Sequence, residues 1–174
     1  MSDRIVDSRR GFELRPGVAT DADALVALSH RAIEHCYRPL LGDAPAARLI
    51  RDGHIEQSVR EGIADCTVIA GSGRPRGYAL CQDNLIRLLF VDPAWQLRGL
   101  GSRLLAAVES TLFARRARLW LESYCRNAPG TAFCARRGWR PVARYLDEAL
   151  GTTRLVLEKD RAATARRVGS TLAG

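Results

Sequence analysis

Apolar residues recur along the chain at spacings that predict one domain of mixed strands and helices. Residues 12–15 (FELR) alternate between apolar and polar side chains, which is typical of a short strand. Thr20 and Asp23 then precede an apolar series at helical spacing, a pattern typical of a capping box at a helix start. Pro39 is expected to end this helix, because proline lacks the N–H that would continue it. The apolar face of the helix would carry Leu25, Leu28, Ala32 and Cys36.

The following segment predicts a second helix and then a series of strands. The helix is expected to begin near Asp43 and to be interrupted around Gly53. The two-residue step Asp83-Asn84 separates two apolar runs and indicates a hairpin, and Asp92-Pro93 ends the second run. The predicted strands of this segment lie at residues 66–70, 77–82 and 85–91.

The C-terminal half predicts a long helix, a strand, a short helix and two further strands. The long helix would bury one face made of Leu104, Leu105, Val108 and Leu112. The five elements lie at residues 99–117, 118–124, 129–137, 141–145 and 153–158. Residues 1–11 and 160–174 are mainly polar and are predicted to be flexible tails, so that the domain would span residues 12–159.

Composition and the N-terminal segment favour a cytoplasmic protein. The chain has 174 residues, within the usual size of one domain. None of its apolar runs approaches the ~20 residues that a membrane-spanning helix needs, and its start lacks the apolar stretch of a secretion signal. Five cysteines include no Cys-x-x-Cys pair, and the three histidines lack metal-ligand spacing, so the sequence predicts neither disulfides nor a metal site.

The charge of the chain is strongly positive and comes almost entirely from arginine. The formal net charge is +8, and Lys159 is the only lysine. Such a surface suits either a nucleic acid or a small phosphorylated cofactor. The arginines are scattered in short pairs, without a basic stripe interleaved with aromatic residues, which disfavours nucleic acid.

The segment with the most chemical content is residues 88–108, which predicts a strand, a glycine-rich turn and an amphipathic helix. Gly99 and Gly101 leave space for a phosphate group to approach the free N–H groups of the first helical turn. Arg98 and Arg103 flank this turn and are candidates for pairing with phosphate oxygens. A dinucleotide fingerprint would need a third glycine where Leu104 stands, so the turn does not match that motif.

Two motifs in this order carry a family resemblance. Gln96 to Gly101 reads Q-x-x-G-x-G after a strand that ends Val-Asp-Pro, and residues 127–139 read NAPGTAFCARRGW. Together they resemble the acyl-CoA-binding and downstream segments of the GNAT superfamily of N-acetyltransferases. The order of elements over residues 12–158 fits as well, so the resemblance covers nearly the whole chain outside its tails.

The resemblance implies an α/β fold with a central mixed, mostly antiparallel sheet of about six to seven strands flanked by helices. It implies acetyl-CoA as acyl donor, no metal, and direct attack by a primary amine in a ternary complex. Leu89, Phe90 and Val91 would offer backbone groups to the pantetheine arm, and the turn would hold the pyrophosphate. The expected cofactor-binding residues are Leu89, Phe90, Val91, Gln96, Leu97, Arg98, Gly99, Leu100, Gly101, Ser102, Arg103 and Asn127.

Acetyl transfer needs a base for the amine, an N–H for the oxyanion and a proton donor for the departing thiolate. The resemblance assigns the oxyanion N–H to Phe90 or Val91. Glu122 is the candidate base, because Leu121-Glu122 stands before Asn127 much as in the branch that acetylates protein N-terminal alanines; a structural strand carboxylate is the alternative. The family's tyrosine acid falls on Cys134, so that the donor is open between Cys134, another tyrosine (Tyr124 or Tyr145) and water.

Two functions are therefore compatible with the sequence. The first is an active N-acetyltransferase whose acceptor is a small-molecule amine or a protein N-terminus. The second is a non-catalytic acyl-CoA-binding sensor or partner-binding module, which the cysteine at position 134 favours. A homodimer is also compatible with the resemblance, and neither nucleic acid nor a membrane is an expected partner.

Overall fold

The computed structural model describes residues 11–161. The two predicted tails lie outside these residues apart from Gly11, Asp160 and Arg161, so the flexibility of the tails stays a prediction. Asp160 is the last residue of a strand rather than the first of a tail. No helix within residues 11–161 is long and apolar enough to cross a membrane.

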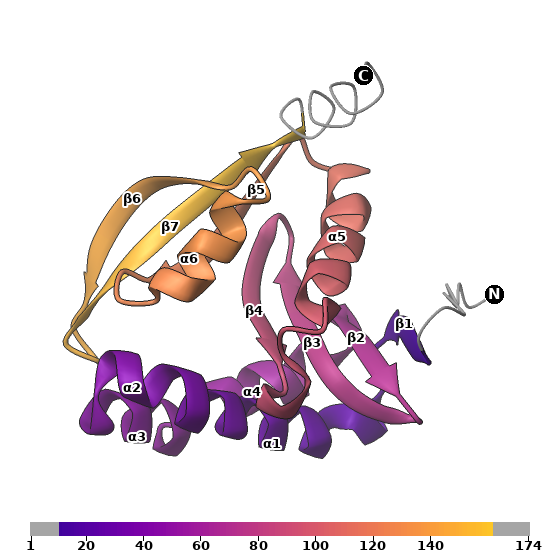
Figure 1. Cartoon of the computed structure of the whole chain (residues 1–174), viewed down its shortest axis with the longest axis horizontal. Coiled ribbons are helices and arrows are strands. Elements are labelled where there is room, and N and C mark those ends of the chain that lie inside the picture. The colour runs from indigo at the N-terminus through magenta and orange to yellow at the C-terminus, as the bar shows by residue number, and fades with distance from the viewer. Residues whose placement is uncertain (1–10, 162–174) are drawn as a thin grey trace.

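The centre of the molecule is one sheet of seven strands in the order β1-β2-β3-β4-β5-β7-β6 (Figure 1). Every neighbouring pair is antiparallel except β4 and β5, which are parallel. Helices flank the sheet, which confirms the predicted fold class. The strands are β1 (Phe12–Pro16), β2 (Cys66–Gly71), β3 (Arg74–Gln82), β4 (Leu85–Val91), β5 (Arg118–Tyr124), β6 (Arg140–Asp147) and β7 (Thr152–Asp160).

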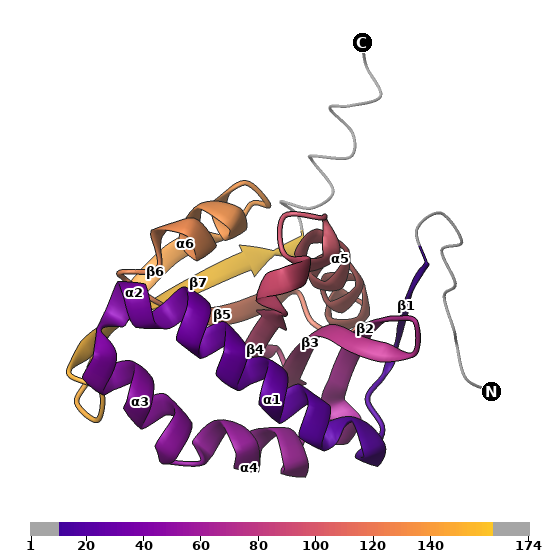
Figure 2. The ribbon, with the colours of Figure 1, turned by 60° about the horizontal axis from the view of Figure 1, so that its bottom comes forward.

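The helices divide between the two faces of the sheet, and each set buries its own apolar core. The first set comprises α1 (Ala22–Ala32), α2 (Arg38–Leu41), α3 (Asp43–Arg51) and α4 (His54–Glu61), which gather on one side (Figure 2). The second set comprises α5 (Leu100–Phe113) and α6 (Ala128–Ala135). Alternate strand residues supply the two cores: Val68 and Tyr78 pack with the first set, and Ile69 and Ala79 with the second.

The start of α1 differs from the predicted capping box at Thr20 and Asp23. Neither side chain caps the helix, and Asp21 takes the position before its first residue instead. The Asp21 carboxylate accepts hydrogen bonds from the Val18 N–H at 3.0 Å and from both terminal nitrogens of Arg15 at 2.6 and 2.9 Å. Arg15 holds the pKa of Asp21 below its usual range. An ion pair with β1 therefore fixes this helix start, which local spacing did not indicate.

Pro39 does not end the first helical segment, contrary to the prediction. A five-residue π-helix, Ile33–Tyr37, follows α1 and shifts the hydrogen-bond register, so that Pro39 falls in the first turn of α2. A proline is tolerated there because the first N–H groups of a helix have no partner within it. The segment ends at Gly42, whose φ of 95° favours glycine.

Strands β4 and β5 pair over only two positions, Leu85 with Trp120 and Ile86 with Leu121, and then diverge. The register between β3 and β4 also shifts next to Arg87, which has no partner on β3. A bulge of this kind bends the strand. The facing edges of β4 and β5 beyond the two pairs consequently carry no strand-to-strand hydrogen bonds.

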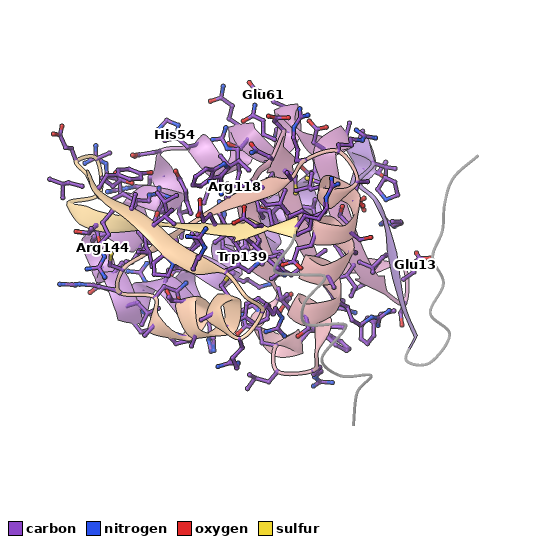
Figure 3. All side chains as sticks on the ribbon, turned by 90° about the horizontal axis from the view of Figure 1, so that it is seen from above. Glu13, His54, Glu61, Arg118, Trp139 and Arg144 are labelled. Atoms are coloured by element: carbon purple, nitrogen blue, oxygen red, sulfur yellow. The ribbon has the colours of Figure 1, made fainter. Side chains whose placement is uncertain are left out.

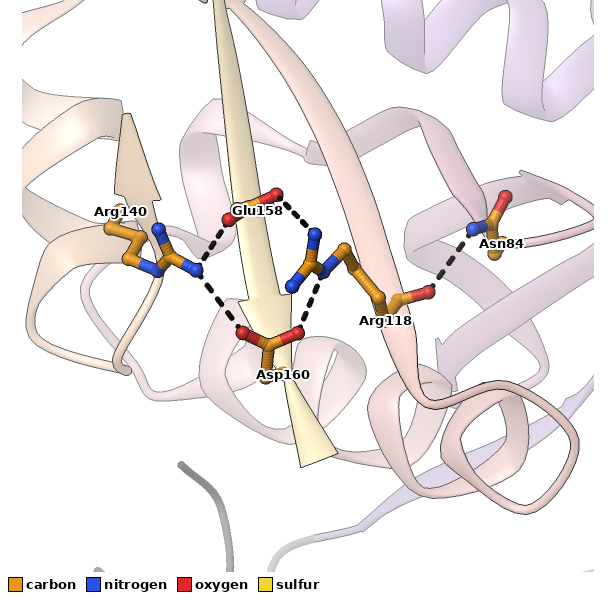
Figure 4. A network of polar contacts seen from close by, with 5 residues as sticks. All are labelled: Asn84, Arg118, Arg140, Glu158 and Asp160. Atoms are coloured by element: carbon orange, nitrogen blue, oxygen red, sulfur yellow. Dashed lines mark hydrogen bonds and ion pairs between the residues drawn. The ribbon is translucent and has the colours of Figure 1, made fainter. Parts of the chain in front are cut away.

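The end of the sheet where β4 and β5 still touch is fixed by a polar network (Figure 4). Arg118 of β5 and Arg140 of β6 both bind the carboxylates of Glu158 and Asp160 on β7, with contacts of 2.5 to 3.6 Å. Asn84, in the turn before β4, donates its side-chain N–H to the Arg118 carbonyl at 3.1 Å and accepts from the Trp120 N–H at 2.9 Å. These contacts hold four strands together on one side of the divergence.

A second network lies inside the core behind α5. Lys159 of β7 donates to Glu109 Oε2 at 2.6 Å, and the indole N–H of Trp139 donates to Glu109 Oε1 at 2.7 Å. All three side chains are buried, and Trp139 lies between the strands and α5 (Figure 3). The network connects the long helix, the turn after α6 and the last strand.

Replacing Glu109 with alanine is expected to destabilise the fold by about 3–5 kcal/mol, because the Lys159 charge would stay buried without its partner. Urea unfolding of the variant and the wild type measures the loss. Glu56→Ala is the control, since it removes an exposed ion pair with Arg60 and is expected to change the unfolding midpoint little. Equal effects of the two substitutions would contradict the role assigned to Glu109.

Candidate active site

The divergence of β4 and β5 opens into a cavity of about 1190 Å³. Its walls come from both helix sets, from the facing halves of the two strands, and from β6 and β7. The volume is large enough for an extended ligand together with a second small molecule. Of the residues predicted to bind the cofactor, those that line the cavity are Leu89, Phe90, Val91, Gln96, Leu97, Gly99, Gly101, Ser102 and Asn127.

At one end of the cavity, the glycine-rich turn presents the start of α5. Leu97 and Gly99 have positive φ values of 59° and 81°, and Gly99 is the N-cap residue with no side chain to bond the helix N–H groups. The first backbone bond into the helix runs from the Arg103 N–H to the Gly99 carbonyl at 3.1 Å. The N–H groups of the first turn are thus available to an anion, and the helix dipole favours one.

Three of the predicted cofactor residues have side chains that do not line the cavity. The guanidinium of Arg98 lies 4.8 Å from the Trp95 ring centre, and Arg103 donates to the Phe12 carbonyl at 3.2 Å. Leu100 is buried in the core under α5. If these residues contact a cofactor from these positions, they do so through their backbone.

Gln96 and Asn127 line the cavity, but both side chains also hold the local backbone. Gln96 donates to the Val91 carbonyl at 3.0 Å and so connects the turn to the end of β4. Asn127 caps α6 by accepting from the Gly130 N–H at 3.1 Å, and it donates to Ser123 Oγ at 3.2 Å. The motif residues therefore shape the cavity as well as border it.

Arg137 is a site residue that the sequence analysis missed. Its guanidinium hydrogen-bonds Ser102 Oγ in the first turn of α5, donates to the Phe133 carbonyl at 3.0 Å and lies 3.8 Å from the Phe133 ring centre. It lines the cavity and forms no ion pair with any residue between 11 and 161. Arg136-Arg137 is one of the arginine pairs that the sequence analysis considered only for their charge. Nothing in the local sequence shows that α6 packs against the start of α5.

The candidate base, Glu122, lies on β5 beyond the last pair with β4 and lines the cavity. Its Oε2 accepts a hydrogen bond from the Tyr145 hydroxyl at 3.1 Å. Partial burial raises the pKa of Tyr145, and the nearby Glu122 charge and this hydrogen bond raise it further. The carboxylate is held in place and stays within reach of a molecule in the cavity.

Two of the three candidate proton-donor side chains, Cys134 and Tyr124, are buried in the cavity wall, whereas the third, Tyr145, is exposed and donates to Glu122. Burial raises the pKa of the Cys134 thiol to about 11 and that of the Tyr124 hydroxyl to about 12. Tyr37, at the end of the π-helix, packs edge-on against Tyr124 and Phe90 with ring centres 5.8 and 5.9 Å apart. Both buried donors therefore stay protonated at neutral pH.

The family follows from comparison with known proteins. Residues 32–139 match the model of the acetyltransferase (GNAT) family. The chain belongs to this family, which confirms the resemblance drawn from its two motifs and supports acyl transfer as the class of reaction. A curated relative, the mycothiol acetyltransferase of Kineococcus radiotolerans, is 35% identical over 129 residues; the match covers 74% of this chain and 37% of the relative's length.

Solved structures show the same fold. A GCN5-related N-acetyltransferase from Rhodopseudomonas palustris superposes with a TM-score of 0.75 at 21% identity, covering 84% of this chain and 94% of that one. The PaiA N-acetyltransferase of Thermoplasma acidophilum, solved in complex with coenzyme A, gives a TM-score of 0.73 at 14% identity, covering 86% and 98%.

The raised pKa of Cys134 predicts slow alkylation of this thiol at pH 8, because only the thiolate reacts. In the folded protein the rate at Cys134 should be at least about 100-fold below that in urea, where a cysteine titrates near 8.5. The rate should also climb about tenfold per pH unit up to pH 10, whereas it levels off in urea. Peptide mass spectrometry after iodoacetamide pulses measures both; fast alkylation at pH 8 would contradict the burial of this thiol.

Proposed function

We propose that the protein transfers an acetyl group from acetyl-CoA to a primary amine by direct attack in a ternary complex. The observation that carries the proposal is the divergence of β4 and β5 into one cavity that reaches from the start of α5 to Glu122. The backbone edge of Leu89 to Val91 that faces β5 pairs with no strand within residues 11–161, and it suits an extended, amide-containing chain such as pantetheine. A donor and an acceptor can then approach from the two ends of the cavity.

Glu122 acts as the base in this proposal. It accepts a proton from the acceptor ammonium, directly or through water, and the freed lone pair attacks the thioester carbon. The C–N bond forms and the C–S bond breaks, with the backbone N–H of Phe90 or Val91 facing the developing oxyanion. The second proton on the attacking nitrogen passes, directly or through water, to the departing thiolate, so that the products are the amide and the free thiol. Tyr145 keeps the carboxylate oriented through its 3.1 Å hydrogen bond.

The leaving thiolate needs stabilisation rather than a strong acid. A thiol of ordinary pKa, near 8.5, is more acidic than either Tyr124 or Cys134 in this wall, whose pKa values are about 12 and about 11. Each of these groups is therefore better suited to donate a hydrogen bond to the thiolate than to give up its proton. The same arrangement suits the second candidate function, a non-catalytic acyl-CoA sensor, which the absence of a tyrosine at position 134 favours.

The acceptor is a small-molecule amine or a protein N-terminus. The curated relative is a mycothiol acetyltransferase, but this chain spans only 37% of its length. We therefore carry over acyl transfer to an amine and leave the particular acceptor to experiment. The cytoplasmic location and the homodimer stay predictions.

Glu122→Gln is expected to lower kcat by about 10²-fold or more, because the amide cannot take the proton. Thiol release with acetyl-CoA and a panel of amines and N-terminal peptides measures turnover, and calorimetry with acetyl-CoA should give an unchanged Kd. Glu148→Gln, in the exposed turn before β7, is the control and should keep full activity. Binding of acetyl-CoA with no thiol release on any acceptor would favour the sensor, and no binding would refute both functions.

Arg137→Ala is expected to weaken acetyl-CoA binding about 10- to 100-fold, because a charge-assisted contact to phosphate is lost. Binding of S-acetylpantetheine, which carries no phosphate, should stay unchanged. Calorimetric titration of both donors makes the comparison, with Arg115→Ala at the far, exposed end of α5 as the charge-matched control. Equal weakening of both donors would contradict a phosphate contact.

A further inference from the structure

The acceptor end of the cavity contains an arginine that lies between two tyrosines of the neighbouring strands. Arg154 of β7 stands opposite Tyr124 of β5 and opposite Tyr145 of β6, so the three residues form a row across one face of the sheet. The guanidinium carbon lies 4.5 Å from the Tyr124 ring centre. All three residues line the cavity, and the arginine side chain is 26% exposed. A guanidinium in this position is partly desolvated, which strengthens its contacts with an anion.

One edge of the Arg154 guanidinium is hydrogen-bonded within the protein, and the edge with the two terminal nitrogens is available to a ligand. Nε donates to Asp147 Oδ2 at 2.9 Å, which fixes the orientation of the planar group. Its two terminal nitrogens make no hydrogen bond to any side chain within residues 11–161, and neither is sealed away from solvent. Two parallel N–H groups of this kind match the two oxygens of a carboxylate.

Glu122 lies on the same face of the sheet as this row, two residues before Tyr124 on β5. Residues two apart on a strand share a face, and the diagonal neighbours across a strand pair are about 7–8 Å apart. Tyr145 connects the two groups, since it stands opposite Arg154 and donates to Glu122 at 3.1 Å. The negative Glu122 and the positive Arg154 are thus neighbours at the acceptor end of the cavity.

We propose that Arg154 binds a carboxylate on the acceptor, so that the substrate class is an α-amino acid or another amine with a carboxylate a few bonds away. This inference rests on the proposed function. Glu122 takes the proton of the ammonium, and the amine nitrogen forms the bond to the acetyl carbon as the C–S bond of acetyl-CoA breaks and the thiol leaves with the second amine proton. The acceptor carboxylate stays bound to Arg154 without reacting. The remaining part of the acceptor contacts the apolar wall formed by Tyr37, Leu49 and Ile55.

An amine without an acidic group fits this end of the cavity less well. Its ammonium would approach Glu122 with the positive guanidinium close by, and the terminal nitrogens of Arg154 would lose water without gaining a partner. A carboxylate removes both penalties. The Tyr124 ring beside the guanidinium favours a planar group that continues its plane, as a carboxylate does.

The proposal is tested by measuring turnover of matched acceptors at saturating acetyl-CoA. Each amino acid is compared with its amide and with the amine that its decarboxylation gives. The wild type is expected to show kcat/KM at least about tenfold higher for the carboxylate member of a pair. Arg154→Gln should lower that value about 10- to 100-fold, mainly through KM, and leave the amides and amines within about threefold. Arg154→Lys keeps the charge without the two-nitrogen edge and should give a smaller loss.

Two controls separate this role from a general effect on charge or folding. Arg144→Gln removes one positive charge from the exposed side of β6 (Figure 3) and should leave the discrimination unchanged. Calorimetry should show the same Kd for acetyl-CoA in the wild type and the Arg154 variants, which establishes that these are folded.

Three outcomes would overturn the inference. These are turnover of amides or plain amines as fast as of their carboxylate partners, no turnover of any carboxylate-bearing acceptor, and an equal loss for both members of a pair in Arg154→Gln. Each of these leaves acetyl-CoA binding intact, whereas failure to bind acetyl-CoA would refute the proposed function itself, and the inference with it.

Discussion

The structure depends on one constraint, that two neighbouring parallel strands touch at two positions and then diverge. Antiparallel pairing with β3 and β7 keeps β4 and β5 within the sheet. A polar network closes the end where β4 and β5 meet, and it consists of Asn84, Arg118, Glu158, Asp160 and Arg140. A sheet normally satisfies its backbone groups by lateral pairing. The facing edges here have no such partner, and this opens the centre of the domain to a ligand.

The two ends of the cavity differ in chemistry because they are built from different parts of the fold. The start of α5, which has no acidic residue in its first turn, and Arg137 supply positive partial and full charge, which suits phosphate groups. The other end pairs acidic with basic groups and surrounds them with aromatic rings, through Glu122, Tyr145 and Arg154. The chain as a whole is positively charged, and the difference between the two ends of the cavity also sets which end each ligand approaches.

Sequence patterns predicted those features that depend on neighbouring residues. The approximate positions of the strands, the break at Gly53 and the glycine turn before α5 follow from periodicity and from the conformational freedom of glycine. The exact ends of the strands do not, since β3 begins at Arg74 in a segment predicted to be a turn. The features that depend on distant partners could not be read in this way. Thr20 lost its expected role because Arg15 pairs with Asp21, and Arg137 and Arg154 reach the cavity only through packing of α6 and through the register of β7.

The buried ion pair behind α5 has a chemical consequence for the protein itself. Thioesters such as acetyl-CoA acylate accessible lysine amines, and members of an acetyltransferase family act in the presence of such donors. The single lysine of this chain, Lys159, is charged, bonded to Glu109 and 6% exposed. Its amine is buried and bonded to a carboxylate, so acylation of lysine, which would consume the donor and alter the protein's charge, has no accessible lysine target on this chain.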